Sequence, residues 1–157
     1  MNDILSIILK DTYSLSQLKH RLRILKSSLL KAFFGGENLT FSPTQLSWLK
    51  SLPTEFYQKF NKDNVYQIFT EIEKEISKLK TLTIYLTFEP DELTLTQLGA
   101  YVRTNFGPNF LLDIKLKPDL IAGPALVWKG IYKDYSLKAK LEARKAEILQ
   151  EFKKFLR

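Results

Sequence analysis

The chain has 157 residues, of which 45% are hydrophobic and 26% are charged, and this composition excludes a disordered or collagen-like protein. Its 24 Lys and Arg residues outnumber its 17 Asp and Glu residues, giving a net charge of +7 that excludes an acidic tail protein. Cysteine is absent and His20 is the single histidine, which excludes disulfides, Cys-ligated zinc, thiol nucleophiles and His-rich metal sites.

The first helix expected in chain order lies between Ser14 and Phe34. Its apolar residues recur at spacings of three and four, the pattern of an amphipathic helix. They are Leu15, Leu18, Leu22, Leu25, Leu29 and Phe33. Ser14 and Gln17 predict a capping box at the start of this helix, and Gly35-Gly36 predicts its end.

Three shorter helical patterns complete the first half of the chain. Ser42-Pro43 predicts the start of a helix that runs to about Leu52, because proline is tolerated at the first helical position. Pro53 interrupts the pattern. The next apolar residues at helical spacing are Phe56, Tyr57 and Phe60, followed by Val65, Ile68, Phe69, Ile72, Ile76 and Leu79. Residues 1–80 are therefore predicted to form an all-α helical bundle.

The apolar period changes to two after residue 80, which predicts a domain boundary near Lys80 and a half-buried strand from Leu82 to Phe88. Thr94 and Gln97 predict a capping box that opens a helix ending at Gly107-Pro108. Alternation then resumes from Phe110 to Leu116, which predicts a second strand.

The last third of the chain predicts a hairpin and a basic helix. An apolar stretch from Leu120 to Trp128 is expected to pair with Ile131 and Tyr132 across a Lys129-Gly130 turn. Ser136 is expected to cap one long helix to Arg157, whose apolar residues are Leu137, Leu141, Ile148, Phe152 and Phe155. The predicted fold class is α+β, with an all-α bundle (1–80) followed by a small β-α-β-β-β-α module with a long C-terminal helix (81–157).

No catalytic, cofactor-binding or metal site is predicted. The Gly35-Gly36 pair lacks the Gly-Lys-Ser/Thr continuation of a phosphate loop, and the apolar runs are too short for a membrane-spanning helix, so we expect a soluble protein. Two carboxylate clusters lack metal-ligand spacing, and we interpret them as a solvated face with Glu71–Lys74 and Glu75–Lys78 pairs and as a helix start. They are Glu71, Glu73 and Glu75, and Glu89, Asp91 and Glu92.

Two other function classes stay open from the residues alone. The basic charge together with 11 Phe, 7 Tyr and 2 Trp residues raises a nucleic-acid-binding protein as the alternative, although most aromatics fall on apolar phases that indicate core packing. A small hydrolase acting through Glu89 and Asp91 ranks last, because the pattern indicates no cleft. His20 lies among basic neighbours, and we expect it to be solvated or at an interface.

The order of elements from Leu82 onward, and two motifs within it, resemble the delta subunit of F-type ATP synthases, the bacterial counterpart of the oligomycin-sensitivity-conferring protein. The first motif is Leu120-Ile121-Ala122-Gly123, whose two small residues would let a strand approach its neighbour closely. The second is Asp134-Tyr135-Ser136, a turn and helix cap that leads to Leu141.

This resemblance implies a non-enzymatic stator subunit without a cofactor, on the cytoplasmic face of the bacterial inner membrane and peripheral to it. In the family, an N-terminal helical bundle receives helices of the alpha subunits of the catalytic head, and the C-terminal part holds the b-type peripheral stalk. Residues 1–80 have room for four or five helices, so a shortened bundle is expected. The helix face from Leu15 to Phe33 is expected to be bundle core, and the alternative is that part of it forms a groove for an incoming amphipathic helix. The basic last helix is the expected stalk interface, through Lys138, Lys140 and Arg144, with no nucleic acid as partner.

Overall fold

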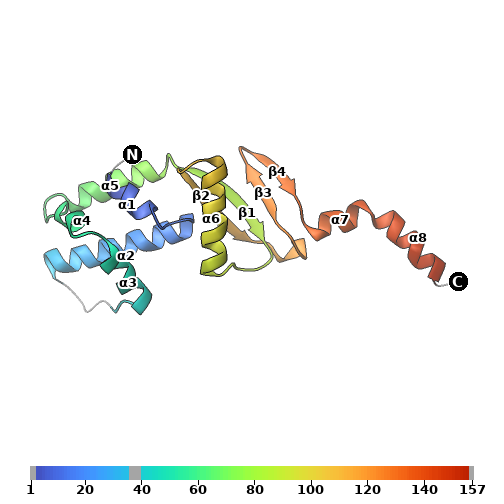
Figure 1. Cartoon of the computed structure of the whole chain (residues 1–157), viewed down its shortest axis with the longest axis horizontal. Coiled ribbons are helices and arrows are strands. Elements are labelled where there is room, and N and C mark those ends of the chain that lie inside the picture. Colours follow the sequence, from blue (N-terminus) through green and yellow to red (C-terminus); the bar gives the residue numbers. More distant parts are fainter. Residues whose placement is uncertain (1–2, 36–39, 156–157) are drawn as a thin grey trace. The chain divides into compact units, whose positions relative to one another are not determined.

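The computed structural model describes residues 3–35 and 40–155, and the chain divides into two compact units, Met1–Lys80 and Thr81–Arg157. We call them the helical unit and the sheet unit. The fold is α+β, as expected: helices make up the helical unit, and the sheet unit contains a four-stranded mixed sheet followed by further helices (Figure 1).

The described part of the helical unit contains α1 (Asp3–Leu9), α2 (Leu15–Phe34), α3 (Pro43–Ser51), α4 (Thr54–Gln58) and α5 (Val65–Ile76). Helices α2 and α5 follow the predicted apolar patterns, because each pattern places several of its apolar side chains on one buried stripe. The shorter helices α3 and α4 bury one residue each, Leu49 and Phe56. Helix α1 was missed by the sequence analysis. Its buried side chains also follow a helical spacing, and they are Ile4, Leu5, Ile8 and Leu9.

Local capping residues set the ends of these helices. Ser42 and Gln45 form the complete capping box of α3. At the start of α2, the Ser14 hydroxyl accepts from the Gln17 amide at 3.1 Å, but the Gln17 side chain accepts from the Tyr13 amide instead of Ser14. Gly35, with φ of 74°, ends α2 as predicted. Its neighbour Gly36 lies outside the described residues.

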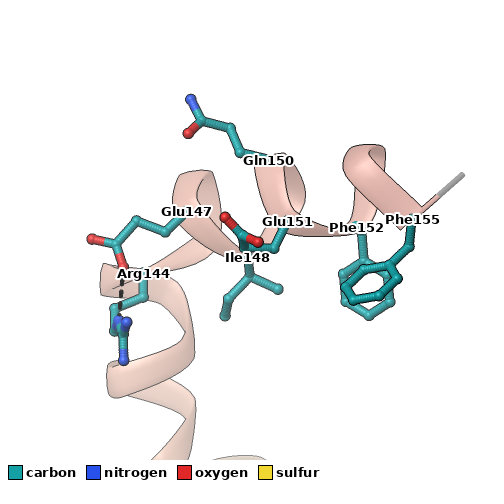
Figure 2. Close-up of a pocket in the computed structure, with 7 residues that line it drawn as sticks. All are labelled: Arg144, Glu147, Ile148, Gln150, Glu151, Phe152 and Phe155. Atoms are coloured by element: carbon teal, nitrogen blue, oxygen red, sulfur yellow. Dashed lines mark hydrogen bonds and ion pairs between the residues drawn. The ribbon is translucent and has the colours of Figure 1, made fainter. Parts of the chain in front are cut away.

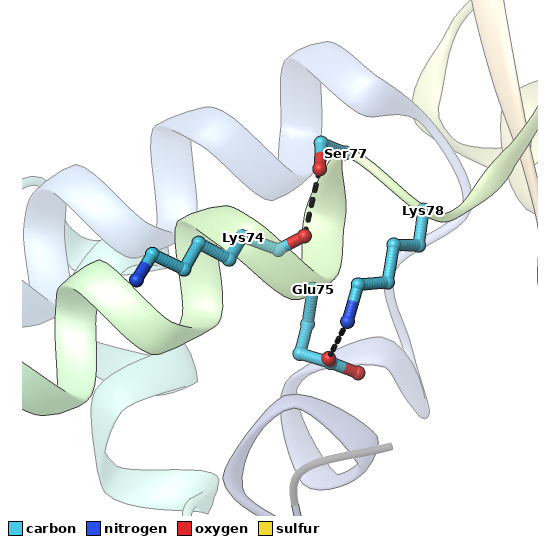
Figure 3. A network of polar contacts seen from close by, with 4 residues as sticks. All are labelled: Lys74, Glu75, Ser77 and Lys78. Atoms are coloured by element: carbon cyan, nitrogen blue, oxygen red, sulfur yellow. Dashed lines mark hydrogen bonds and ion pairs between the residues drawn. The ribbon is translucent and has the colours of Figure 1, made fainter.

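Helix α5 ends earlier than its apolar pattern predicts. The pattern extends to Leu79, but the helix stops at Ile76, and residues 77–79 form turns (Figure 3). The Ser77 hydroxyl donates to the Lys74 carbonyl at 2.7 Å and so competes with the helical hydrogen bonds of the backbone. Lys78 pairs with Glu75, also at 2.7 Å, which confirms one of the charged contacts expected on this face.

The sheet of the second unit has the strand order β2-β1-β3-β4. Its strands are β1 (Lys80–Leu86), β2 (Phe110–Leu116), β3 (Ala125–Trp128) and β4 (Ile131–Asp134). β1 pairs antiparallel with β3, and β3 pairs antiparallel with β4, so the β1·β2 pair, joined through α6 (Glu92–Phe106), is the parallel one. The buried core between this helix and the sheet consists of Leu82, Ile84, Val102, Phe110 and Leu112.

Two predicted boundaries around α6 need correction. The helix is capped by Asp91, whose carboxylate accepts from the Thr94 amide at 2.7 Å, so the predicted Thr94–Gln97 capping box is wrong. An aspartate at this position also suits the positive end of the helix dipole. The preceding strand ends at Leu86, and Phe88 beyond it is 64% exposed. Gly107 ends α6 as predicted, with φ of 116°.

The predicted hairpin is confirmed. Lys129 and Gly130 have φ angles of 49° and 78°, and positive φ at both central positions is what a type I′ turn between two strands requires. The predicted strand from Leu120 is wrong in its first part. A short 3-10 turn, η1 (Pro118–Leu120), and an irregular segment precede β3, which starts only at Ala125.

Candidate interaction surfaces

The Leu120-Ile121-Ala122-Gly123 motif forms a turn between η1 and β3 instead of part of a strand. Leu120 is buried, whereas Ile121 is exposed and has φ of 67°, a backbone conformation that branched residues rarely adopt. The Ala122 carbonyl accepts from the Leu137 amide at 2.7 Å. The motif therefore anchors the start of α7 (Leu137–Ala143) to the sheet unit.

The close approach expected from the small residues occurs at Gly123, but its neighbour is a loop rather than a strand. A Cβ atom added to Gly123 would lie 3.0 Å from the Tyr135 carbonyl oxygen, and the φ of Gly123 is 80°. The Tyr135 amide donates to the Pro124 carbonyl at 3.0 Å. Glycine is needed here for both its backbone conformation and its lack of a side chain.

Asp134 and Ser136 form the turn and helix cap expected from the second motif. The Asp134 carboxylate accepts from the Ser136 amide at 2.8 Å, and the buried Ser136 hydroxyl accepts from the Ala139 amide at 3.2 Å. Hydrogen bonds from Ser136, with smaller contributions from the Tyr132 hydroxyl and the charge of Lys117, lower the pKa of Asp134. The carboxylate is thus held ionised in a structural role.

The C-terminal segment is two helices, not the single long helix predicted. α7 ends at Ala143, Arg144 adopts φ of −108° and ψ of 12°, and α8 runs over Lys145–Phe155 (Figure 1). Arg157, the predicted end, lies outside the described residues. Neither α7 nor α8 buries a described side chain. Lys138 is half-buried, and Lys140, Leu141 and Arg144 are exposed.

The side of α8 that carries its apolar residues is open to solvent. Figure 2 shows Ile148, Phe152 and Phe155 along this helix, with Glu147 and Glu151 beside them. Phe152 is 61% exposed and Phe155 is 87% exposed. Arg144 pairs with Glu147 at 2.9 Å. An amphipathic helix with its apolar side uncovered is the form that a partner helix or another apolar surface recognises.

A groove of about 460 Å³ lies between α2 and α5 in the helical unit. Its floor consists of Leu22, Phe69 and Ile72, which are buried, and of Ile76, which is half-buried. The α2 side of the groove carries three cations at helical spacing, Lys19, Arg23 and Lys26, and the α5 side carries Glu73. The Lys26 ammonium lies 5.5 Å from the centre of the Phe69 ring, which is a cation–π contact. We call this surface the α2/α5 groove.

The α2 side of this groove was expected as an alternative to bundle core, but the contribution of α5 was not, because the groove forms only when two separated helices pack together. The cations recur at spacings of four and three, which marks one side of α2, and the apolar stripe of α5 was recognised. The sequence pattern does not indicate that α2 and α5, which are separated by α3 and α4, pack against each other. Periodicity indicates which side of a helix is apolar, but not which other helix packs against that side.

His20 and the carboxylates have structural contacts. The His20 ring nitrogens lie 3.3 Å from an Arg23 guanidinium nitrogen and 3.1 Å from the Gln45 amide nitrogen. Glu71 accepts from the Gln67 side chain at 3.0 Å, in place of the charged contact with Lys74 expected for it. Among residues 3–35 and 40–155, no group of three or more histidine, aspartate or glutamate side chains is placed to hold a metal ion.

The side of the sheet opposite α6 contains an aromatic pair that the sequence pattern did not indicate. The Tyr85 and Tyr132 rings pack edge to face at 6.4 Å, and the Lys117 ammonium lies 5.7 and 5.8 Å from their centres. Burial and the hydrogen bond to Asp134 raise the pKa of Tyr132. Because these side chains contact one another, the cluster is a cross-strand packing feature of β1 and β4.

No protein-family model matches the chain, and no curated protein matches it. Across the described ranges, no helix has both the length and the apolar character needed to cross a membrane.

Proposed function

We propose that this protein is a non-catalytic stator subunit of an F-type ATP synthase that links the catalytic head to the peripheral stalk. The observation that supports this proposal is that each compact unit has its own candidate docking surface with basic residues beside it: the α2/α5 groove, and the exposed side of α7 and α8. Two separate docking surfaces on one chain suit a bridging protein. The resemblance of residues 81–155 to the delta subunit gives the bridge its proposed partners.

The head side of the bridge is the α2/α5 groove, which takes an N-terminal helix of an alpha subunit. The groove runs between two helices, as in other helix-in-groove complexes, and its half-buried Ile76 offers an apolar contact to the incoming helix. Lys19, Arg23 and Lys26 favour acidic residues on the incoming helix. The helical unit has α1 to α5 in its described residues, and this shortened set of helices still forms a groove.

The stalk side of the bridge is the C-terminal pair of helices, which contacts the b-type stalk. Lys138, Lys140 and Arg144 supply the positive charge, and the apolar residues of α8 supply the contact area. The Ala122–Leu137 and Gly123–Tyr135 contacts fix the start of α7, so that a load on these helices reaches the sheet unit. A stator needs such mechanical continuity, and it needs no bond chemistry or cofactor of its own.

The experiment that tests this proposal is an affinity pull-down of the tagged full chain from gently solubilised membranes of its source, with mass spectrometry of the eluate. Recovery of the head and stalk subunits together supports the bridge and a location at the cytoplasmic face of the inner membrane. Recovery of nucleic acid or ribosomal proteins in their place contradicts it and favours a basic nucleic-acid-binding protein. Steep loss of that binding with added salt would identify contacts to phosphates.

A further inference from the structure

Five large apolar residues of α7 and α8 would form one continuous stripe if the two helices were joined and straight, and a sixth, Leu149, would lie beside it. At 3.6 residues per turn, the five fall within about 60° of one another around a single helix axis. They are Leu137, Leu141, Ile148, Phe152 and Phe155. We call this stripe the seam. In the structure the break at Arg144 divides it, with two members on α7 and three on α8.

The residues at the break do not encode a break. Residues 142–147 are Glu-Ala-Arg-Lys-Ala-Glu, which are all good helix formers. They include neither glycine nor proline. Sharp kinks in helices usually have such a residue, or an inserted side chain, as their cause. Arg144 leaves the helical region through φ of −108° and ψ of 12°, a sparsely populated conformation. The break is therefore weakly held by the local sequence.

Straightening the segment would add backbone hydrogen bonds. Across the break, the Arg144 amide donates to the Lys140 carbonyl at 3.3 Å and the Ile148 amide donates to the Arg144 carbonyl at 3.0 Å. The amides of residues 145–147 form the first turn of α8 and have no carbonyl four residues back within that helix. In a straight helix they would donate to the carbonyls of residues 141–143.

The charges beside the seam indicate the chemistry of the surface that covers it. On a straight helix, Lys138 and Lys145 lie on one side of the seam. Lys140 and Arg144 lie on the other side, together with Glu147 and Glu151. These positions hold four cations and two anions, and Arg144 already pairs with Glu147. A partner helix with acidic residues beside its own apolar stripe would complement this pattern, as charged flanking residues do in coiled coils.

We infer that α7 and α8 join into one straight helix when an acidic amphipathic helix packs along the seam. Covering Leu137, Leu141, Ile148, Phe152 and Phe155 in one contact favours the straight form, because the broken form cannot present them as one stripe. This inference rests on the stalk surface of the proposed function and adds that the surface is completed by binding. The new backbone hydrogen bonds form within this chain and do not involve the partner.

Two variants at Lys145 separate the straight form from the broken form. Lys145 is the first residue of α8, where proline is tolerated. The residue before a proline prefers an extended backbone, so Lys145→Pro turns Arg144 from its ψ of 12° to a more extended value and keeps the two helices separate. In a straight helix the same proline removes the hydrogen bond to residue 141 and clashes with its carbonyl. Lys145→Ala removes the same charge and permits the straight helix, which makes it the matched control. Equal urea midpoints for the two variants would show that the rest of the chain is equally stable in both.

The probe is a synthetic peptide of about three heptads with Leu at positions a and d and Glu at positions e and g. We expect it to bind the full-length wild-type chain and Lys145→Ala, and to bind Lys145→Pro at least about 100-fold more weakly. Hydrogen exchange of the amides of residues 145–147 should slow on binding, and the Arg144 Cα chemical shift should move to a helical value. Equal affinity of the two variants, or slow exchange of these amides in the free chain, overturns the inference.

A second probe distinguishes this inference from the proposed function. It is the soluble domain of the b-type stalk from the same source, tested against the same two variants. If the synthetic peptide discriminates between the variants and the stalk domain does not bind, the helix transition stands and the stalk assignment fails. If the stalk domain binds both variants equally and the synthetic peptide does not discriminate between them, the stalk assignment stands and the transition is overturned.

Discussion

Gly123 lies directly against the backbone of Tyr135, where an added Cβ atom would be 3.0 Å from the carbonyl oxygen. Gly130 provides a matched comparison, because its φ of 78° is nearly the same as the 80° of Gly123 but nothing lies within 4 Å of its Cβ position. The two glycines therefore separate the cost of the left-handed conformation from the cost of crowding.

We expect Gly130→Ala to lower the free energy of unfolding by about 1 kcal/mol, the cost of a left-handed alanine. Gly123→Ala should cost about 1 kcal/mol more, because the Tyr135 backbone must also move. Urea denaturation monitored by circular dichroism measures both values. Equal costs for the two variants would mean that the loop at Tyr135 adapts without strain.

Replacing Ser136 removes the cap of α7. We expect Ser136→Ala to destabilise the sheet unit by about 1 kcal/mol, since the Ala139 amide loses its acceptor in a buried position. Urea denaturation together with hydrogen exchange of the first turn of α7 would detect the loss. Unchanged stability and unchanged exchange at residues 137–139 would contradict the structural role of the motif.

The pH dependence of stability should include a contribution from Asp134. Its pKa in the folded chain lies below the ordinary value of 3.8, chiefly because Ser136 donates to its carboxylate. The stabilisation is present above the unfolded pKa and disappears as the pH falls through the folded pKa. We therefore expect wild type to be more stable than Asp134→Asn at pH 7 and this difference to shrink in acid. A difference that stays constant across a pH series of urea midpoints would contradict this.

Charge reversal should test the proposed stalk surface. Changing Lys138, Lys140 and Arg144 together to Glu should weaken binding of the stalk domain by about tenfold or more, while the circular dichroism spectrum stays unchanged. A control with the same change in net charge reverses the exposed Lys10, Lys50 and Lys62 of the helical unit. Calorimetric titration of both variants measures the effect. Wild-type affinity in the first variant would remove these residues from the interface.

A corresponding change tests the proposed head surface. Arg23→Glu with Lys26→Glu reverses two cations beside the α2/α5 groove, and we expect it to weaken binding of a peptide from the N-terminus of the alpha subunit by about tenfold. The control pair is Lys50→Glu with Lys62→Glu. Fluorescence anisotropy of the labelled peptide gives the affinities, and equal loss in both pairs would indicate a general charge effect instead of a groove.

Local signals in the sequence predicted most of the elements. Ser42 with Gln45, Gly35, Gly107 and the Lys129-Gly130 turn each act through the conformation of a few neighbouring residues, and each occurs at its predicted place. The apolar periods of α2, α5 and β2 were sufficient for the same reason. These features depend on backbone conformation and short-range hydrogen bonds, which a sequence pattern contains directly.

The errors arose where a choice between neighbouring signals or a tertiary contact decides the outcome. Asp91 is chosen over Thr94 as the cap of α6, although both residue types are suitable. Ile121 adopts a positive φ because the Ala122 and Gly123 backbone is held against α7 and its preceding loop. The break at Arg144 has no signal in the sequence. Of the candidate site, the turn at Asp134 and Ser136 was predictable, whereas the α2/α5 groove depends on helix packing.

The position of β1 inside the sheet has a consequence for folding during synthesis. β1 lies between β2 and β3, and its partner Val127 for Thr83 belongs to the hairpin made much later in the chain. The β1-α6-β2 segment can collapse first, but one edge of β1 stays unpaired until the hairpin leaves the ribosome. Closing this long loop should limit the folding rate of the sheet unit, and exposed β1 is the segment at which aggregation would start.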